Sequence, residues 1–328
     1  MSFPARVSRR ILVALLLALS CGPTSGEAQE HRSRNQKPSP THRDVAYGTH
    51  PRNLLDFYQA EVARPAPLVI YIHGGGFAQG SKDSFGRNPA LSRLLGQGIH
   101  VASISYRYVR GGPDPKPLPG PLHDCARAVQ FLRHKAADWK IDPQRVGAFG
   151  SSAGGQASLW LAFHNDLADP QSSDPIERES TRLQCVGSIN GPCSTDPAWI
   201  ERHLTGAQVE WFRGIIEKDF GLDSYRDAYR KEFRGRIREC APITHLSPDD
   251  PPVYLQHSAP LQEIRSRNYP GGLIHCPLFG VRLAEELDSM GIEHVLVIQR
   301  ETHGTGRDPY GSLSSFLAAQ LLTARQRR

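Results

Sequence analysis

The amino-acid sequence predicts an α/β domain with a mostly parallel central sheet and helices on both faces of that sheet. Two observations lead to this fold class. Short runs of β-branched and aromatic residues alternate with longer segments of helical periodicity, which is typical of parallel sheets covered by helices. The strand-like runs are apolar throughout rather than at every second position, which indicates burial on both faces. No internal repeat or linker interrupts the pattern within the 328 residues, so we expect one domain.

The predicted elements follow one another along the chain. The run 67–73 is β-branched and aromatic and is ended by glycines, as expected of a buried strand. Runs of similar character are found at 100–106, 145–150, 186–190, 252–257 and 293–299. Helices are predicted at 122–138, where the apolar spacing is amphipathic, and at 153–163, 279–290 and 312–324.

A long excursion separates the strands predicted at 186–190 and 252–257. Residues 191–250 far exceed the dozen or so that a crossover connection requires. Insertions at the carboxyl edge of a parallel sheet lie where α/β folds bind ligands. We therefore predict a helical lid over a site, and extra packing against the body is the alternative.

The two ends of the chain are predicted to lie outside the domain, which we place at residues 44–322. Residues 1–21 hold a basic stretch and then an apolar run too short to span a membrane, the pattern of a signal peptide. The end of this stretch resembles a lipoprotein signal, in which Cys21 would carry lipid. Residues 22–43 have the composition of a flexible leader, and 323–328 form a basic tail. We expect an exported protein, periplasmic, secreted or lipid-anchored, with Cys21 as its sole membrane attachment.

The net charge of +6 does not indicate nucleic-acid binding. Three arginines lie in the predicted signal peptide and three in the last four residues, so the rest of the chain holds as many acidic as basic residues. The five cysteines beyond Cys21 lack the Cys-x-x-Cys spacing of a zinc site, so no metal is expected.

The segment Gly150-Ser151-Ser152-Ala153-Gly154 lies between a predicted strand and a predicted helix. In this context G-x-S-x-G is typical of a nucleophile elbow, a tight turn that exposes the hydroxyl of its central serine. The two glycines leave room for the turn, and the helix N-terminus supplies free N–H groups and partial positive charge. Ser152 is therefore the candidate nucleophile, and a Gly/Ser-rich turn without chemistry is the alternative.

Two further motifs complete the pattern. The sequence His73-Gly74-Gly75-Gly76-Phe77 directly follows the first predicted strand, and such a glycine loop supplies an oxyanion hole in esterases and lipases. The N–H groups of Gly74, Gly75 and Ala153 are the predicted donors, and one such donor is worth roughly 3 kcal/mol in comparable enzymes. His303 follows the last predicted strand, where the general base for Ser152 belongs in chain order.

These motifs resemble those of α/β-hydrolases of the hormone-sensitive lipase and carboxylesterase type. The chain is most similar to the small secreted esterases grouped with feruloyl and acetyl-xylan esterases. Matching segments also occur at 105–108, 142–145 and 241–245, and the resemblance covers about residues 44–322. It implies hydrolysis of a carboxylic ester of a small molecule or a carbohydrate, through an acyl-enzyme and without a cofactor.

The catalytic acid departs from the family pattern. The family usually has His-Gly-x-x-Asp after its fifth motif strand, and here His257-Ser258-Ala259-Pro260-Leu261 places leucine at the carboxylate position. Glu263 is the nearest replacement, and Asp196, after the fourth predicted strand, is the other candidate. Asp196-Pro197 also fits a helix N-cap. Loss of the acid can lower turnover by about 10⁴. The sequence therefore predicts a serine esterase, and the alternative is a non-catalytic or weakly active binding protein on a hydrolase scaffold.

Overall fold

The computed structural model describes residues 38–204, 206–261, 274–304 and 308–323. The predicted signal peptide with Cys21, most of the predicted leader, Glu263 and nearly all of the basic tail lie outside these ranges. The chain from Pro38 onward forms one structural unit. Its first strand begins at His42, two residues before the predicted start of the domain.

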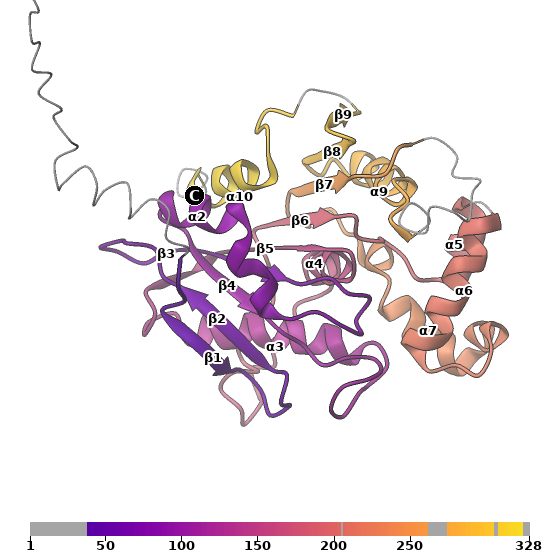
Figure 1. The fold of residues 1–328 in the computed structure, drawn as a ribbon, viewed down its shortest axis with the longest axis horizontal. Coiled ribbons are helices and arrows are strands. Elements are labelled where there is room, and N and C mark those ends of the chain that lie inside the picture. The colour runs from indigo at the N-terminus through magenta and orange to yellow at the C-terminus, as the bar shows by residue number, and fades with distance from the viewer. Residues whose placement is uncertain (1–37, 205, 262–273, 305–307, 324–328) are drawn as a thin grey trace, which may run out of the picture. The chain divides into compact units, whose positions relative to one another are not determined.

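The centre of this unit is a sheet with the strand order β1-β2-β4-β3-β5-β6-β7-β8-β9 over the described residues (Figure 1). Neighbouring strands are parallel from β4 to β8, whereas β1, β2 and β9 at the edges pair antiparallel. The strands are β1 (His42–Ala46), β2 (Leu54–Tyr58), β3 (Ala66–Ile72), β4 (His100–Ile104), β5 (Ile141–Ser151), β6 (Cys185–Ile189), β7 (Val253–His257), β8 (His294–Ile298) and β9 (Glu301–His303).

All six predicted strands are confirmed, as β3 to β8, with ends that differ by a few residues. The prediction missed the three antiparallel strands β1, β2 and β9, of which β1 and β9 form the edges of the sheet. β1 has the sequence HRDVA and β9 has the sequence ETH, so neither shows the apolar run that marks a strand buried on both faces.

Helices cover both faces of the sheet, as predicted. The helices α2 (Pro89–Gly96) and α10 (Leu313–Thr323) pack on one face, and α3 (Gly120–His134), α4 (Ala153–Phe163) and α9 (Leu278–Ser289) pack on the other. Within β3, Leu68 and Ile70 face the core under α3 and α4, while Val69 and Tyr71 face the core under α2 and α10. A short 3-10 helix, η1 (Lys82–Arg87), precedes α2. None of the described helices is long and apolar enough to cross a membrane.

The insertion at 191–250 is helical, as predicted, and its elements lie together beside the sheet (Figure 1). They are α5 (Pro197–His203), α6 (Gly206–Phe220), η2 (Tyr225–Tyr229), α7 (Lys231–Glu239) and η3 (Pro242–His245). The rings of Trp199 and Phe212 each lie 5.3 Å from the ring of Phe279 in α9. Ile216 and Phe220 are buried in the same core as α4. The insertion is therefore part of the packed body.

The five described cysteines are all buried, and none of them forms a disulfide. Burial raises the pKa of each thiol, so these residues act as small apolar core groups.

Candidate active site

Ser152 lies at the sharp turn between β5 and α4, where the motif predicts it. Its backbone has φ +54° and ψ −120°, a conformation that non-glycine residues rarely adopt and that costs of order 1–3 kcal/mol. Its N–H donates to the carbonyl of Ile189 at 2.8 Å, and its carbonyl accepts from the N–H of Gln156 at 3.0 Å. The neighbouring strand and the helix thus both hold the strained turn.

The glycines of the motif allow three backbone segments to meet at this turn. A Cβ atom on Gly150 would lie 2.4 Å from the carbonyl oxygen of Gly154. A Cβ atom on Gly154 would lie 2.1 Å from the carbonyl oxygen of Ile72, at the end of β3. Both distances are far below van der Waals contact, so a larger residue would displace backbone. This close packing brings the turn against the loop that follows β3.

That glycine loop borders Ser152. A Cβ atom on Gly74 would lie 2.7 Å from the carbonyl oxygen of Ser151. Gly75 has φ +111°, which glycine adopts readily and other residues do not. Within the described part of the chain, no carbonyl accepts from the N–H of Gly74, Gly75 or Ala153. The glycine loop thus brings two of the three predicted oxyanion donors, Gly74 and Gly75, next to the turn that carries Ser152.

His73 fixes the shape of the glycine loop. Its buried ring stacks on Tyr106 with centroids 4.2 Å apart, and the Tyr106 hydroxyl donates to the His73 carbonyl at 2.8 Å. Burial lowers the pKa of His73 to about 4, so the imidazole is neutral at pH 7. Its Nδ1 then donates to the Gly74 carbonyl at 2.7 Å, which leaves the loop little freedom.

A cavity of about 790 Å³ opens at Ser152. The glycine loop, Ser151, Ile274 and His275 line it together with Arg110. No described residue of the insertion 191–250 belongs to this lining. The contacts that the structure shows for the insertion are packing contacts with the body. The insertion reaches the rim through Asp219 of α6, which pairs with Arg110 at 2.6 Å.

The hydroxyl of Ser152 hydrogen bonds to His275, with Oγ and Nε2 3.1 Å apart. His275 lies between β7 and α9, at the carboxyl edge of the sheet. Burial lowers its pKa, so the imidazole is neutral at pH 7 and can accept a proton. His275 was not predicted, because the family pattern leads one to expect a carboxylate rather than a histidine after β7. The one sequence feature that could have indicated His275 is its position between a predicted parallel strand and the helix that follows it.

The structure does not bring His303 to Ser152. The prediction assumed a loop after β8, whereas the chain turns back through Gln299 and Arg300, at φ +50° and +73°, into a hairpin. His303 therefore pairs with Leu296 of β8 on the edge strand β9. β9 is the fourth strand beyond β5, and strands about 4.8 Å apart place it roughly 19 Å away.

Of the two predicted acids, Asp196 lies within the described residues, and no described hydrogen bond joins it to His275. Asp196 caps α5, and its carboxylate accepts from the N–H of Ala198 at 2.9 Å, as its place before a proline indicates. Glu263 lies outside the described residues. Leu261, at the carboxylate position of the family pattern, is 46% exposed and is therefore a surface residue. Among described residues, no carboxylate hydrogen bonds to either His275 or His303.

Comparison with known proteins agrees with this architecture. Residues 55–265 match the BD-FAE family, which is more than half of the chain. The chain belongs to the BD-FAE family. The matched range contains the glycine loop, the elbow and the insertion, and it ends before His275 and His303.

Individual relatives are distant. The probable carboxylic ester hydrolase LipM of Mycobacterium tuberculosis is 25% identical over 235 residues, which are 68% of this chain and 49% of LipM. The chain spans about half the length of the curated relatives it matches. An acetyl ester-xyloside bifunctional hydrolase from Caldicellulosiruptor lactoaceticus has 22% identity and a TM-score of 0.57 over 83% of each chain. A truncated carbohydrate esterase from gut microbiota has 19% identity and a TM-score of 0.63 over 88% of this chain and 98% of its own. These structures confirm the α/β-hydrolase fold.

Proposed function

We propose that this BD-FAE protein is a serine esterase that hydrolyses a carboxylic ester through an acyl-enzyme. The observation that carries the proposal is the strained Ser152, whose hydroxyl lies 3.1 Å from an imidazole nitrogen and beside the glycine loop. This is the arrangement of an activated nucleophile. The name of LipM, a probable carboxylic ester hydrolase, supports the same reaction.

Each group has one role in the proposed mechanism. The Ser152 Oγ attacks the ester carbonyl carbon while its proton passes to Nε2 of His275. The carbonyl oxygen becomes an oxyanion that accepts from the N–H groups of Gly74, Gly75 and Ala153. The imidazolium returns the proton to the departing alcohol, which leaves an acyl group on Ser152. Water, deprotonated by the same imidazole, then releases the carboxylic acid and restores the hydroxyl.

His303 is the second candidate for the base, and chain order rather than distance supports it. It would act only if β9 left β8 and carried His303 toward Ser152. The second candidate function is that of a weakly active or non-catalytic binding protein, and leucine at position 261, where the family pattern has a carboxylate, supports it. Measured turnover on a simple ester separates these functions.

We propose an ester-decorated carbohydrate as the substrate class. The names of two structural neighbours, an acetyl ester-xyloside hydrolase and a carbohydrate esterase, support this class, and a cavity of about 790 Å³ has room for a sugar. The test compares acetate release from acetylated xylan with hydrolysis of p-nitrophenyl acetate by the full chain. Release from both supports the proposal. Hydrolysis of p-nitrophenyl acetate alone would leave an esterase of another substrate class, and hydrolysis of neither would contradict the esterase itself.

We also propose that the protein is exported, with residues 1–21 removed or with Cys21 lipidated. Mass spectrometry of the protein from its native host tests this. A terminus at or beyond Cys21 is expected. An intact Met1 would contradict export, and an unmodified Cys21 would contradict only the lipid anchor.

A further inference from the structure

A second group of polar side chains lies at the opposite end of α4 from Ser152. α4 has 11 residues, begins directly after Ser152 and ends before His164. A helix of that length extends about 16 Å. The group at His164 is therefore separate from the cavity, whose lining contains none of its members.

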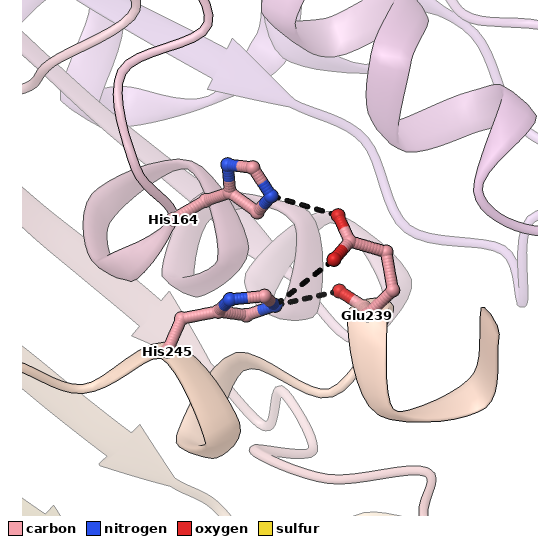
Figure 2. A group of neighbouring side chains, drawn as sticks. All are labelled: His164, Glu239 and His245. Carbon is pink, nitrogen blue, oxygen red and sulfur yellow. Dashed lines mark hydrogen bonds and ion pairs between the residues drawn. The ribbon is translucent and has the colours of Figure 1, made fainter. Parts of the chain in front are cut away.

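His164, Glu239 and His245 direct their side chains toward one another from three segments (Figure 2). Nε2 of His164 lies 2.7 Å from Oε1 of Glu239, and Nε2 of His245 lies 4.0 Å from Oε2 of the same carboxylate. All three ligand atoms lie within 4.8 Å of one another. His164 follows α4, Glu239 ends α7, and His245 ends η3.

The second nitrogen of His164 determines which form its ring takes. Nδ1 lies 2.8 Å from the carbonyl oxygen of Asn165, and because a carbonyl only accepts, Nδ1 carries the proton. In a neutral ring, Nε2 then presents a lone pair to a carboxylate oxygen 2.7 Å away. Two lone pairs that face each other at 2.7 Å repel, so a proton lies in this contact in the metal-free chain, and a metal ion can take the place of that proton. Donation from one nitrogen to a carbonyl is also how metal-binding histidines are oriented.

His245 can join a metal ion at little cost to its surroundings. Its Nε2 lies 2.7 Å from the backbone carbonyl of Glu239, which also accepts from Nε1 of Trp160 at 2.7 Å. If the His245 proton moves to Nδ1 and the ring turns Nε2 from this carbonyl toward the Glu239 carboxylate, Nε2 can bind a metal ion while Trp160 keeps the carbonyl satisfied. The side chains of His164, His245 and Glu239 are 13%, 16% and 39% exposed, so water can fill the remaining coordination positions.

We propose that His164, Glu239 and His245 form a site for a divalent metal ion, with zinc as the best match. Two imidazoles and one carboxylate are a common zinc ligand set, whereas magnesium and calcium prefer oxygen ligands alone. The bound ion would join the end of the nucleophile-bearing helix α4 to α7 and η3 of the insertion. We assign the ion a structural role, the cross-linking of these segments.

The test measures zinc binding by the untagged full chain after treatment with EDTA. We expect about one zinc ion per chain after dialysis, a rise in Tm on adding ZnCl₂, and no such rise with MgCl₂. His164→Gln and His245→Gln should each weaken zinc binding by at least about tenfold. His134→Gln, at an exposed histidine of α3 outside the group, is the matched control and should bind zinc as the unmodified chain does.

Circular dichroism identifies variants that fail to fold. If either histidine variant fails, Glu239→Gln, at the most exposed of the three ligands, is used for the zinc measurement instead. Ser152→Ala should bind zinc normally, which separates this site from the proposed esterase. Less than stoichiometric zinc in the unmodified chain would overturn the proposal. Zinc binding that survives both histidine substitutions would do the same. Either result would assign the contact between His164 and Glu239 to a proton.

Discussion

The two halves of the candidate active site differ in what holds them in place. In the half formed by the glycine loop and the elbow, backbones approach so closely that a Cβ atom on Gly154 would lie 2.1 Å from a carbonyl oxygen. The half formed by the segments after β7 and β8 supplies the base and the acid, and there the function requires only a side chain that can accept a proton. Steric demands of the first kind restrict the sequence to glycine and serine at fixed spacing. Demands of the second kind allow several histidines and carboxylates, so this half is where sequence and structure differ.

The largest expected effect lies in the glycine half. Ser152→Ala removes the attacking oxygen, so kcat for p-nitrophenyl acetate should fall by about 10³ or more. The change removes one oxygen atom and should leave the circular dichroism spectrum unchanged. Ser173→Ala, at an exposed serine, is the matched control and should keep full activity. Retention of most activity by Ser152→Ala would show that the elbow does not carry the nucleophile.

The next effect decides between the two histidines. His275→Ala should lower kcat by about 10³ or more, because the Ser152 hydroxyl loses its proton acceptor. His303→Ala should stay within a few fold of the unmodified protein, because His303 lies on the edge strand β9. The opposite result would show that the working enzyme opens the β8–β9 hairpin and uses the residue that chain order predicts.

The third effect concerns the carboxylate that orients the imidazole. If Glu263 orients the imidazole, Glu263→Gln should lower kcat by up to about 10⁴ with little change in KM, while Asp196→Asn should act only on the cap of α5. The reverse pattern would move the acid to Asp196. If neither substitution changes kcat, the site works without these carboxylates. Leu261→Asp should fold, because Leu261 is 46% exposed, and a rise in kcat would show that its position still faces the base.

The smallest expected effect is a shift in the pH profile. Burial lowers the pKa of His275 from its ordinary value of 6.5, and the imidazole is active as a base only when it is neutral. Activity should therefore persist as the pH falls to 6.5 and decline at lower pH, through the depressed pKa. A profile of kcat/KM with an acid limb above 6.5 would contradict His275 as the base.

The sequence predicted the fold and the placement of Ser152 and the glycine loop, because both depend on backbone sterics and apolar patterns. The six parallel strands were visible as apolar runs, and Ser152 and the glycine loop as motifs in the right context. The polar edge strand β9 gave no such pattern, and its hairpin carries His303 away from the cavity. His275 was missed because it follows β7 by a long connection, and no local sequence pattern marks a histidine that becomes a neighbour only through the tertiary fold.

Covalent labelling tests whether Ser152 is an activated nucleophile. A fluorophosphonate probe reacts with activated serine hydroxyls, so the folded chain should gain one probe, located on Ser152 by peptide mass spectrometry. Urea-unfolded protein and Ser152→Ala should gain none. A folded chain that remains unlabelled, or that carries its label on another serine, would contradict the account.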